Sequence, residues 1–554
     1  MRIVYKNFTI THKIILVLIL IAILFQIPII LVRHFDNDEF EHLHGARNIY
    51  HGMVPYRDYF EHHTPFSHYF LALLYIFLAD KIELIFLARF IMLVFTCAIL
   101  YLTFRLAKLL YDLNVALLAT LFLSYVLMFQ RKTIEVRPDV PALIFWLLAL
   151  FFFVSGIMAQ DEHRKKRPKK YFLASGIMMA SAILTTQKAL FAAIGLFLVW
   201  ICILFERQTE SSLKERIALM VWFGLGFSIP FGITCLYFFM NNALGDFIYR
   251  NFIMNIQWKA GFTPHGLIRR LIIENTFFSL MSLLGLAIAT FQLLKAKKRS
   301  YGSFVPLLST YILIIGLFII PIPQQQYYLL LLPLLAIYCG FIFNAFISYF
   351  SWEQFKKLRT KQSYLRFGLR LVSLVAVTIA FGLTLTYNKV NTLTFRNIPN
   401  FYLWVWLFLL PFLLWYYIKD NRQLFTVVLL IGTLIYPFVC MTKQISFRNN
   451  KNQLNEIRFI LQNASSQDTI FDGWRGTGVF RNHAYYYYFL HSEIQMMLTP
   501  KELSEDIIEV LRNKKPKFII YDKSIRALPE KVNNYIKDNY KPTGLGEIYV
   551  LENH

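Results

Sequence analysis

Acidic and imidazole side chains crowd two short stretches that follow the first long apolar run of the sequence. The stretches read Asp36-Asn-Asp-Glu-Phe-Glu-His-Leu-His44 and Asp58-Tyr-Phe-Glu-His-His-Thr-Pro65. Carboxylates and imidazoles held together supply a general base or the ligands of a divalent cation. Any one of them is by default a solvated loop residue, but the aromatic and Pro-Tyr residues among them predict a packed loop, where unpaired carboxylates are costly.

The spacing within the first stretch favours acid–base or oxygen-ligand chemistry over a zinc site. Asp38 and His42 lie four residues apart and would share one face of a helix. His42 and His44 match no recognised zinc spacing, and no cysteine accompanies them. The histidines alone are therefore a weaker indication of a metal.

Polar breaks between later apolar runs add cations and hydrogen-bonding groups. Arg137-Pro-Asp139 opens one apolar run, and Lys188 ends the hinge Thr185–Lys188 between two others. By default the Arg-Pro-Asp triplet is a pair of interfacial anchors, and Lys188 snorkels to the lipid headgroups. A cation at the rim of a helix bundle is also what a phosphate group needs. The hinge is otherwise uncharged, so the sequence shows no evident carboxylate partner for Lys188.

The elements that position these residues are membrane-spanning helices. Only 16% of the residues are charged and 57% are hydrophobic, whereas soluble chains carry about 25% charged residues. Apolar runs long enough for a hydrocarbon core about 30 Å thick recur along the chain. We expect an all-α polytopic membrane protein with about 13 transmembrane helices, at 14–32, 84–110, 114–130, 140–158, 171–186, 189–205, 217–240, 276–294, 304–320, 327–350, 371–387, 400–418 and 424–441.

The placement of the basic residues predicts the orientation of the chain. The net charge of +24 comes largely from short loops such as Arg164–Lys170, Lys295–Arg299 and Lys356–Arg370. Loops of this kind face the cytoplasm, which places the N-terminus inside and the polar segment 442–554 outside the cytoplasmic membrane. Phe66–Ala79 is apolar but too short for a comfortable span, so we expect a helix at the outer membrane surface. No basic stripe with stacking aromatic residues lies on a polar segment, which argues against a nucleic-acid partner.

Two units are expected. Residues 1–441 form a transmembrane module with outer loops at 33–83 and 241–275, and residues 442–554 form a small α/β domain outside the membrane. In the domain, helical patterns alternate with strand-like runs. The helical patterns lie at Asn452–Gln462, Lys501–Asn513 and Glu530–Asp538. The strand-like runs lie at Thr469–Phe471, Lys517–Tyr521 and Glu547–Leu551.

The ordered set of motifs resembles the GT-C membrane glycosyltransferases. Within them it is most similar to the protein-mannosyltransferase-like group, which includes the aminoarabinose transferases of lipid A and Rgt-type enzymes. The matching elements are Asp38-Glu39 with His42, Gly52…Pro55-Tyr56-Arg-Asp58, Phe60-Glu-His-His-Thr-Pro65, Arg137-Pro-Asp139, Gln187-Lys188 and Gln326-Tyr327. Glu61-His-His-Thr-Pro departs from the Glu-Lys-Pro-Pro type of element in better-known members, so the identity of donor and acceptor does not carry over.

The resemblance implies transfer of a sugar from a polyprenyl-phosphate donor to an acceptor outside the cytoplasmic membrane, with inversion at the anomeric carbon. The acceptor can be a glycolipid, a polysaccharide or a protein. The resemblance implies catalytic roles for Asp38, Glu39, Glu61 and Asp139, and binding of the donor phosphate by Lys188 and Arg137. Substrate-binding roles are implied for His42, Asp58, His62, His63, Gln326 and Tyr327. The pattern requires no cofactor, and it leaves open whether Asp38 and Asp139 bind a divalent cation.

The alternative function is a transporter or flippase of lipid-linked sugars. Proton-coupled transporters place acids or histidines inside the membrane along their pathway. The predicted spans hold few ionisable side chains, Arg89 and Arg105 being the main exceptions. This favours the enzyme, although a flippase with a hydrophilic cavity stays open. A third possibility, a non-catalytic assembly protein, would tolerate replacement of Asp38 and Lys188.

Overall fold

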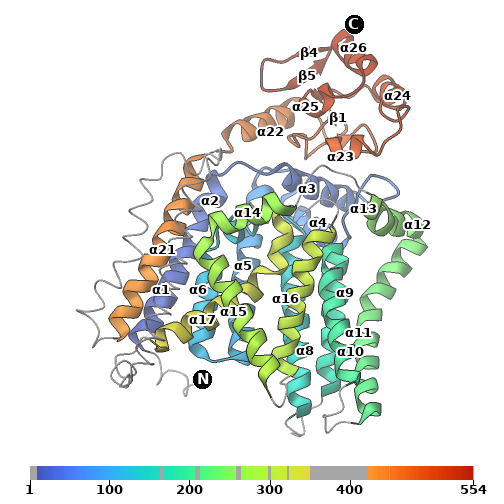
Figure 1. Ribbon diagram of the computed structural model, residues 1–554. Coiled ribbons are helices and arrows are strands. Elements are labelled where there is room, and N and C mark those ends of the chain that lie inside the picture. The colour runs from blue at the N-terminus through green and yellow to red at the C-terminus, as the bar shows by residue number, and fades with distance from the viewer. Residues whose placement is uncertain are drawn as a thin grey trace, which may run out of the picture.

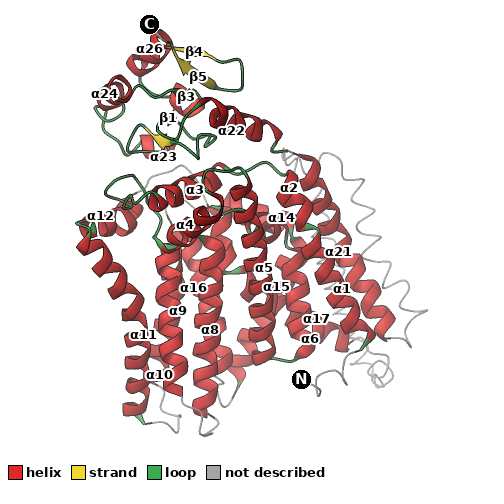
Figure 2. Ribbon diagram, turned by 180° about the vertical axis from the view of Figure 1, so that it is seen from behind, coloured by secondary structure: helices red, strands yellow, loops and turns green. Residues whose placement is uncertain are grey.

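A bundle of long helices stands beneath a small domain that covers one end of it (Figures 1 and 2). The structure, a computed structural model, describes residues 9–161, 168–205, 212–257, 264–296, 301–320, 324–349, 422–447 and 449–552. In these ranges, eight helices are long and apolar enough to cross a membrane. Further apolar helices are shorter, at Phe66–Leu78, Leu113–Tyr125 and Leu332–Ser348. The prediction of a mostly helical polytopic membrane protein is confirmed.

Every predicted span that lies in the described ranges falls on helix. The helices are α1 (Ile10–Leu24), α2 (Gln26–Val32), α5 (Glu83–Leu110), α6 (Leu113–Tyr125), α7 (Leu127–Lys132), α8 (Asp139–Asp161), α9 (Pro168–Thr185), α10 (Leu190–Phe205), α11 (Leu213–Met240), α15 (Thr276–Lys295), α16 (Tyr301–Ile319), α17 (Leu332–Tyr349) and α21 (Arg422–Phe447). The predicted spans 371–387 and 400–418, and most of the cluster Arg164–Lys170, lie outside the described residues. The count of 13 therefore stays a prediction.

Two of the predicted spans are interrupted rather than continuous. The first breaks at Phe25 between α1 and α2, and the third at Val126 between α6 and α7. Broken backbone at membrane depth has to find partners within the protein. The Asn275 side chain provides one by accepting the Leu127 N–H at 2.7 Å.

Close packing of α9 against α11 fixes the height of the hinge that follows α9. A Cβ atom on Gly176 would clash with the Phe223 carbonyl, and one on Gly226 would clash with the Leu173 carbonyl. Small residues that let two backbones approach are the usual contact between membrane helices. The hinge, a short 3-10 helix η2 (Gln187–Ala189), then reaches the first loop, where the Gln187 amide donates to the His62 carbonyl at 2.7 Å.

The loop 33–83 folds into two helices at the end of the bundle that the small domain covers (Figure 1). These are α3 (Asn37–Tyr50) and the apolar α4 (Phe66–Leu78). Asp36 caps α3 in a reciprocal capping box with Glu39. The Tyr75 hydroxyl of α4 donates to the Leu43 carbonyl at 2.8 Å, so the two helices are packed together. α12 (Leu244–Ile248), α13 (Met254–Gln257) and α14 (Pro264–Glu274) lie at the same end.

The C-terminal domain is built on a five-stranded sheet in the order β2-β1-β3-β5-β4. Its strands are β1 (Thr469–Asp472), β2 (Asn482–His483), β3 (Phe518–Ile520), β4 (Tyr540–Pro542) and β5 (Ile548–Leu551). Its helices are α22 (Lys451–Asn463), α23 (Ser492–Gln495), α24 (Glu505–Lys514), α25 (Lys523–Arg526) and α26 (Glu530–Asn539). β1 pairs in parallel with β2 and β3, while β5 is antiparallel to both of its neighbours. The predicted small α/β domain is confirmed.

Directional bonds dock this domain onto the first loop. The backbone N–H of Phe60 donates to the Tyr486 carbonyl at 3.0 Å. Arg47, whose side chain is 1% exposed, donates to both oxygens of Asp80 and to the Asn482 side chain at 2.8 Å. The domain and the loop therefore form one packed unit at this end of the bundle.

We expect Arg47→Ala to destabilise this unit, because it leaves the Asp80 carboxylate and the Asn482 amide without their buried partner. Removing one member of a buried ion pair costs about 3–5 kcal/mol. The thermal midpoint of the purified protein in detergent measures the loss. Arg57→Ala is the matched control, because Arg57 is exposed and its contacts among the described residues are with its neighbour Asp58 and the Asn241 carbonyl. Equal midpoints for Arg47→Ala and the wild type would contradict the docking role.

Candidate active site

A single guanidinium gathers three carboxylates between the first loop and the start of α8. Arg137 donates from Nε to Glu135 at 2.6 Å, from Nη1 to Asp38 at 2.7 Å and from Nη2 to Asp36 at 2.9 Å. Its side chain is 4% exposed. Residues about 100 positions apart in the sequence thus meet at one point. The Arg-Pro-Asp triplet at 137–139 is therefore not a pair of interfacial anchors, because Arg137 is the centre of an ionic network.

The network favours the ionised form of two of its three carboxylates, Asp38 and Glu135, whereas burial raises the pKa of Asp36. Burial raises the pKa of Asp38, but the positive charges of Arg137 and Lys132 outweigh burial and lower that pKa below its ordinary value. Glu135 is fully buried, yet Lys132, Arg137 and Arg33 hold its pKa well below the usual range. A lowered carboxyl pKa stabilises the fold above the group's unfolded pKa, and this stability is lost as pH falls through the lowered value. Both groups are therefore charged at neutral pH.

A second ion pair lies beside the first. Asp139, at the start of α8, accepts from Lys188 Nζ at 2.8 Å. The same ammonium lies 4.0 Å from the centre of the Tyr327 ring, in the 3-10 helix η4 (Gln325–Leu330). The expectation that Lys188 has no carboxylate partner is wrong, because its partner comes from another helix. The ammonium is largely buried, with 12% of the side chain exposed.

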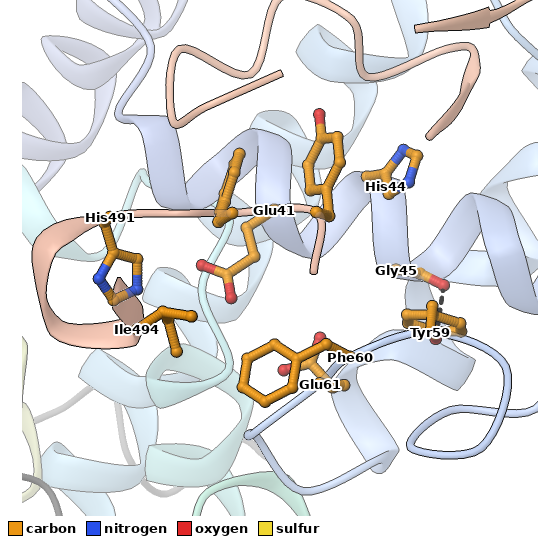
Figure 3. A pocket seen from close by; sticks show the side chains of 10 residues that line it. Glu41, His44, Gly45, Tyr59, Phe60, Glu61, His491 and Ile494 are labelled. Carbon is orange, nitrogen blue, oxygen red and sulfur yellow. Dashed lines mark hydrogen bonds between the residues drawn. The ribbon is translucent and has the colours of Figure 1, made fainter. Parts of the chain in front are cut away.

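The third group of charges lines a pocket between the first loop and the C-terminal domain (Figure 3). Its walls are Glu41, His44, Gly45, Tyr59, Phe60, Glu61, Tyr488, Phe489, His491 and Ile494. Figure 3 shows the Glu41 carboxylate pointing into the space that His491 faces from the opposite side. The C-terminal domain therefore supplies part of the pocket wall.

Glu61 is the most firmly held carboxylate of this pocket. Its Oε1 accepts the backbone N–H groups of His62 and His63, each at 2.9 Å. The same oxygen lies 2.8 Å from His63 Nδ1, while Oε2 lies 3.1 Å from His68 Nε2. Its orientation is thus fixed by backbone and side-chain donors together.

Glu41 has a different environment. The described contacts give it one ionic partner, His62 Nδ1 at 3.6 Å. Burial and the nearby negative charges of Glu61 and Asp38 raise the pKa of Glu41 well above its ordinary value. Asp38 and Glu41 both lie on α3, so the pocket adjoins the Arg137 network.

Several residues expected in the site lie outside its centre. Glu39 is fully buried, and its two carboxylate oxygens accept hydrogen bonds from Arg89 at 2.6 and 2.8 Å. Asp58 pairs with the adjacent Arg57 and accepts the Val54 N–H, away from the network. These contacts favour positioning roles over the roles that the sequence suggested.

The remaining expected residues are close to the charged groups. His42 is buried with Nδ1 at 3.2 Å from His68 Nε2, and burial, then His63 and His68, lower its pKa well below the ordinary value. Gln326 is buried in η4 next to Tyr327. Arg137 already donates to carboxylates from all three of its nitrogens, so it organises the network rather than standing open to a phosphate.

Sequence reasoning missed Glu41, Glu135 and His491 as members of the site. Glu41 stands within the first polar stretch and Glu135 two residues before Arg137, so proximity to the other charged residues was a usable signal. His491 belongs to a domain that begins about 400 residues later, and no local pattern marks it. Only the docking of the domain brings its ring to the pocket.

Comparison with known proteins adds two kinds of similarity. Residues 62–233 match the protein family described as dolichyl-phosphate-mannose-protein mannosyltransferase. No curated protein sequence matches the chain.

Two solved structures share the fold over most of this chain. ArnT from Cupriavidus metallidurans bound to undecaprenyl phosphate is 12% identical, with a TM-score of 0.63 over 97% of each chain. The archaeal oligosaccharyltransferase AglB from Archaeoglobus fulgidus, in complex with an inhibitory peptide and a dolichol-phosphate, is 12% identical, with a TM-score of 0.55 over 97% of this chain and 74% of that chain. The similarity includes the bundle and the domain above it.

The buried pair of Glu39 and Arg89 gives a test of their role. We expect Glu39→Gln to lower the thermal midpoint of the purified protein clearly, because breaking a fully buried pair costs roughly 3–5 kcal/mol. Glu83→Gln is the matched control, since Glu83 is exposed at the start of α5. A Glu39→Gln variant with unchanged stability and lost activity would restore the catalytic role suggested by the sequence.

Proposed function

We propose that this chain, which has the fold of the GT-C membrane glycosyltransferases, transfers a sugar from a polyprenyl-phosphate donor to an acceptor at the outer face of the cytoplasmic membrane. The observation that carries the proposal is that two ion pairs, Asp38 with Arg137 and Lys188 with Asp139, are joined through the short segment 137–139 at one end of the bundle. The transfer needs one group to receive a proton and another to hold the departing phosphate.

Asp38 is suited to receive the proton. One of its oxygens accepts from Arg137, while 27% of the side chain remains exposed and within reach of an acceptor. Its lowered pKa keeps it unprotonated at neutral pH. The acceptor oxygen attacks the anomeric carbon as its proton passes to Asp38, and the bond from that carbon to the phosphate oxygen breaks. Attack from the face opposite the phosphate inverts the anomeric centre.

Lys188 is suited to hold the phosphate. Its ammonium lies at the start of an apolar helix, so a phosphate there would continue into a lipid tail within the bilayer. Charge-assisted hydrogen bonds to phosphate are among the strongest that a side chain makes. Asp139 aims the ammonium until a phosphate arrives. The undecaprenyl phosphate bound to ArnT and the dolichol-phosphate bound to AglB support a lipid phosphate as carrier.

Asp38→Asn tests the proton transfer. We expect turnover to fall by about 10²-fold or more, because positioned general bases contribute 10²- to 10⁴-fold. The measurement is release of polyprenyl phosphate from a labelled polyprenyl-phosphate sugar by purified protein in liposomes, together with sugar transfer to envelope glycans.

Asp58→Asn is the matched control, because in the part of the chain that the structure describes Asp58 contacts the nearby Val54 N–H and Arg57. Wild-type turnover in Asp38→Asn would remove Asp38 from the mechanism. Movement of intact lipid-linked sugar across the liposome bilayer without transfer would favour the flippase alternative.

Lys188→Ala tests the phosphate site. We expect the KM for the donor to rise much more than the KM for the acceptor, since only the donor carries the phosphate. Lys188→Arg should recover part of the loss, because a planar fork replaces a compact charge. Lys81→Ala, which alters an exposed lysine at the same end of the bundle, should leave both values unchanged.

Loss of Lys188 also leaves Asp139 without its cation. The double variant Lys188→Ala with Asp139→Asn removes that unpaired charge and should keep the selective donor defect. Recovery of normal donor use in the double variant would show that Lys188 only neutralises Asp139.

A further inference from the structure

Four side chains with metal-ligating atoms converge at the pocket between the first loop and the C-terminal domain. They are Glu41, Glu61, His62 and His63, and one ligand atom from each lies within 4.8 Å of all the others. Two carboxylates and two imidazoles from two separate turns of the chain are thereby gathered around one point.

The carboxylates of this cluster differ from Asp38 and Asp139 in the cations that surround them. Asp38 and Asp139 each have a protein cation, Arg137 and Lys188 respectively. Within the described ranges, neither Glu41 nor Glu61 forms an ion pair with a lysine or an arginine. Glu61 accepts from backbone N–H groups and histidines instead, whereas the described contacts give Glu41 His62 alone, and a largely buried carboxylate with so little compensation is costly.

We propose that Glu41, Glu61, His62 and His63 form a binding site for one divalent transition-metal ion of the Zn²⁺ class. A set of two nitrogens and two oxygens suits Zn²⁺, whereas Ca²⁺ and Mg²⁺ prefer oxygen ligands alone. The site differs from the cation position between Asp38 and Asp139 that the sequence left open, because those two carboxylates are already paired.

The distances fit a compact coordination sphere. Bonds of about 2.0–2.1 Å to zinc place tetrahedral ligands roughly 3.3 Å apart. The pair His63 Nδ1 and Glu61 Oε1 is separated by 2.8 Å, and the pair His62 Nδ1 and Glu41 Oε1 by 3.6 Å. Small side-chain movements bring both pairs to the required spacing.

Surrounding groups hold the ligands in place. Two backbone N–H groups and His68 orient the Glu61 carboxylate. The His42 ring contacts the ring of His63 edge-on, with centroids 4.8 Å apart, and bonds to His68. Such outer contacts typically change metal affinity by 10- to 100-fold when they are removed.

The ion would link helix α3, which carries Glu41, to the loop that carries Glu61 to His63. Through Glu41 and Glu61 both line the pocket, which His491 of the C-terminal domain faces (Figure 3). The proposal rests on the ligand geometry and does not depend on sugar transfer.

Metal binding to the full-length protein tests the site directly. Tag-free protein in detergent is stripped with a chelator and titrated with Co²⁺ by visible absorption and with Zn²⁺ by calorimetry. We expect one ion per chain, a tetrahedral Co²⁺ spectrum, and displacement of Co²⁺ by Zn²⁺. No saturable binding, or binding with a six-coordinate spectrum, would overturn the proposal.

Variants locate the ion. The double variant His62→Ala with His63→Ala should abolish the tetrahedral spectrum and weaken Zn²⁺ binding by at least roughly 100-fold. His51→Ala, at an exposed histidine of the same loop, should bind as the wild type does. Unchanged binding in the double variant would overturn the proposal.

Two further readouts complete the test. Equal thermal midpoints of the metal-free wild type and double variant show that folding is intact, and a single variant, Glu41→Gln, repeats the test if they differ. Because binding is measured without any sugar donor, a normal titration in a protein without transferase activity would count against the proposed function alone.

Discussion

The burial of Arg137 among three carboxylates is the constraint on which the candidate site depends. Asp36, Asp38 and Glu135 could not be held together at the end of a membrane bundle without a compensating cation. A guanidinium is suited to the task because its planar fork offers several donors in fixed directions. The same contacts join the capped start of α3 to the turn before α8, so the charge balance also fixes the relative position of two distant segments.

The surrounding architecture protects this charge balance. Glu39 and Arg89 form a second buried pair behind the network, and Glu39 also accepts the Val136 N–H at 3.1 Å. The C-terminal domain closes the remaining side, where Asn482 accepts from Arg47, the Tyr486 carbonyl accepts from Phe60, and His491 lines the pocket. Partial exclusion of water strengthens the electrostatic interactions of Asp38 and Lys188. The C-terminal domain, which the sequence shows only as a polar segment after the last apolar run, therefore forms part of the pocket wall.

The sequence predicted what depends on length and local pattern. Apolar runs located the helices because the bilayer fixes their length, and short strand-like runs located β1, β3 and β5 of the terminal domain but not β2 and β4. The break at Phe25 precedes Pro28, which lacks the N–H that would continue the helix, and the break at Val126 was missed because its partner Asn275 lies far away in the sequence. The ion pair of Lys188 with Asp139 was missed because the two residues lie on different helices. The position of His491 in the pocket wall was missed because the other pocket residues lie far away in the sequence. Asp38, Arg137 and Lys188 were found because charges beside apolar runs are conspicuous, whereas the partners of Glu39 and Asp58 required the folded chain.

The central claim is that the charged end of the bundle receives a lipid phosphate. Native mass spectrometry of the purified protein with equal amounts of undecaprenyl phosphate and undecaprenol tests it most directly, because the two lipids differ only in the phosphate. The account predicts selective retention of undecaprenyl phosphate by the wild type and loss of that selectivity when Lys188 is replaced by alanine. Equal retention of both lipids by the wild type would contradict it.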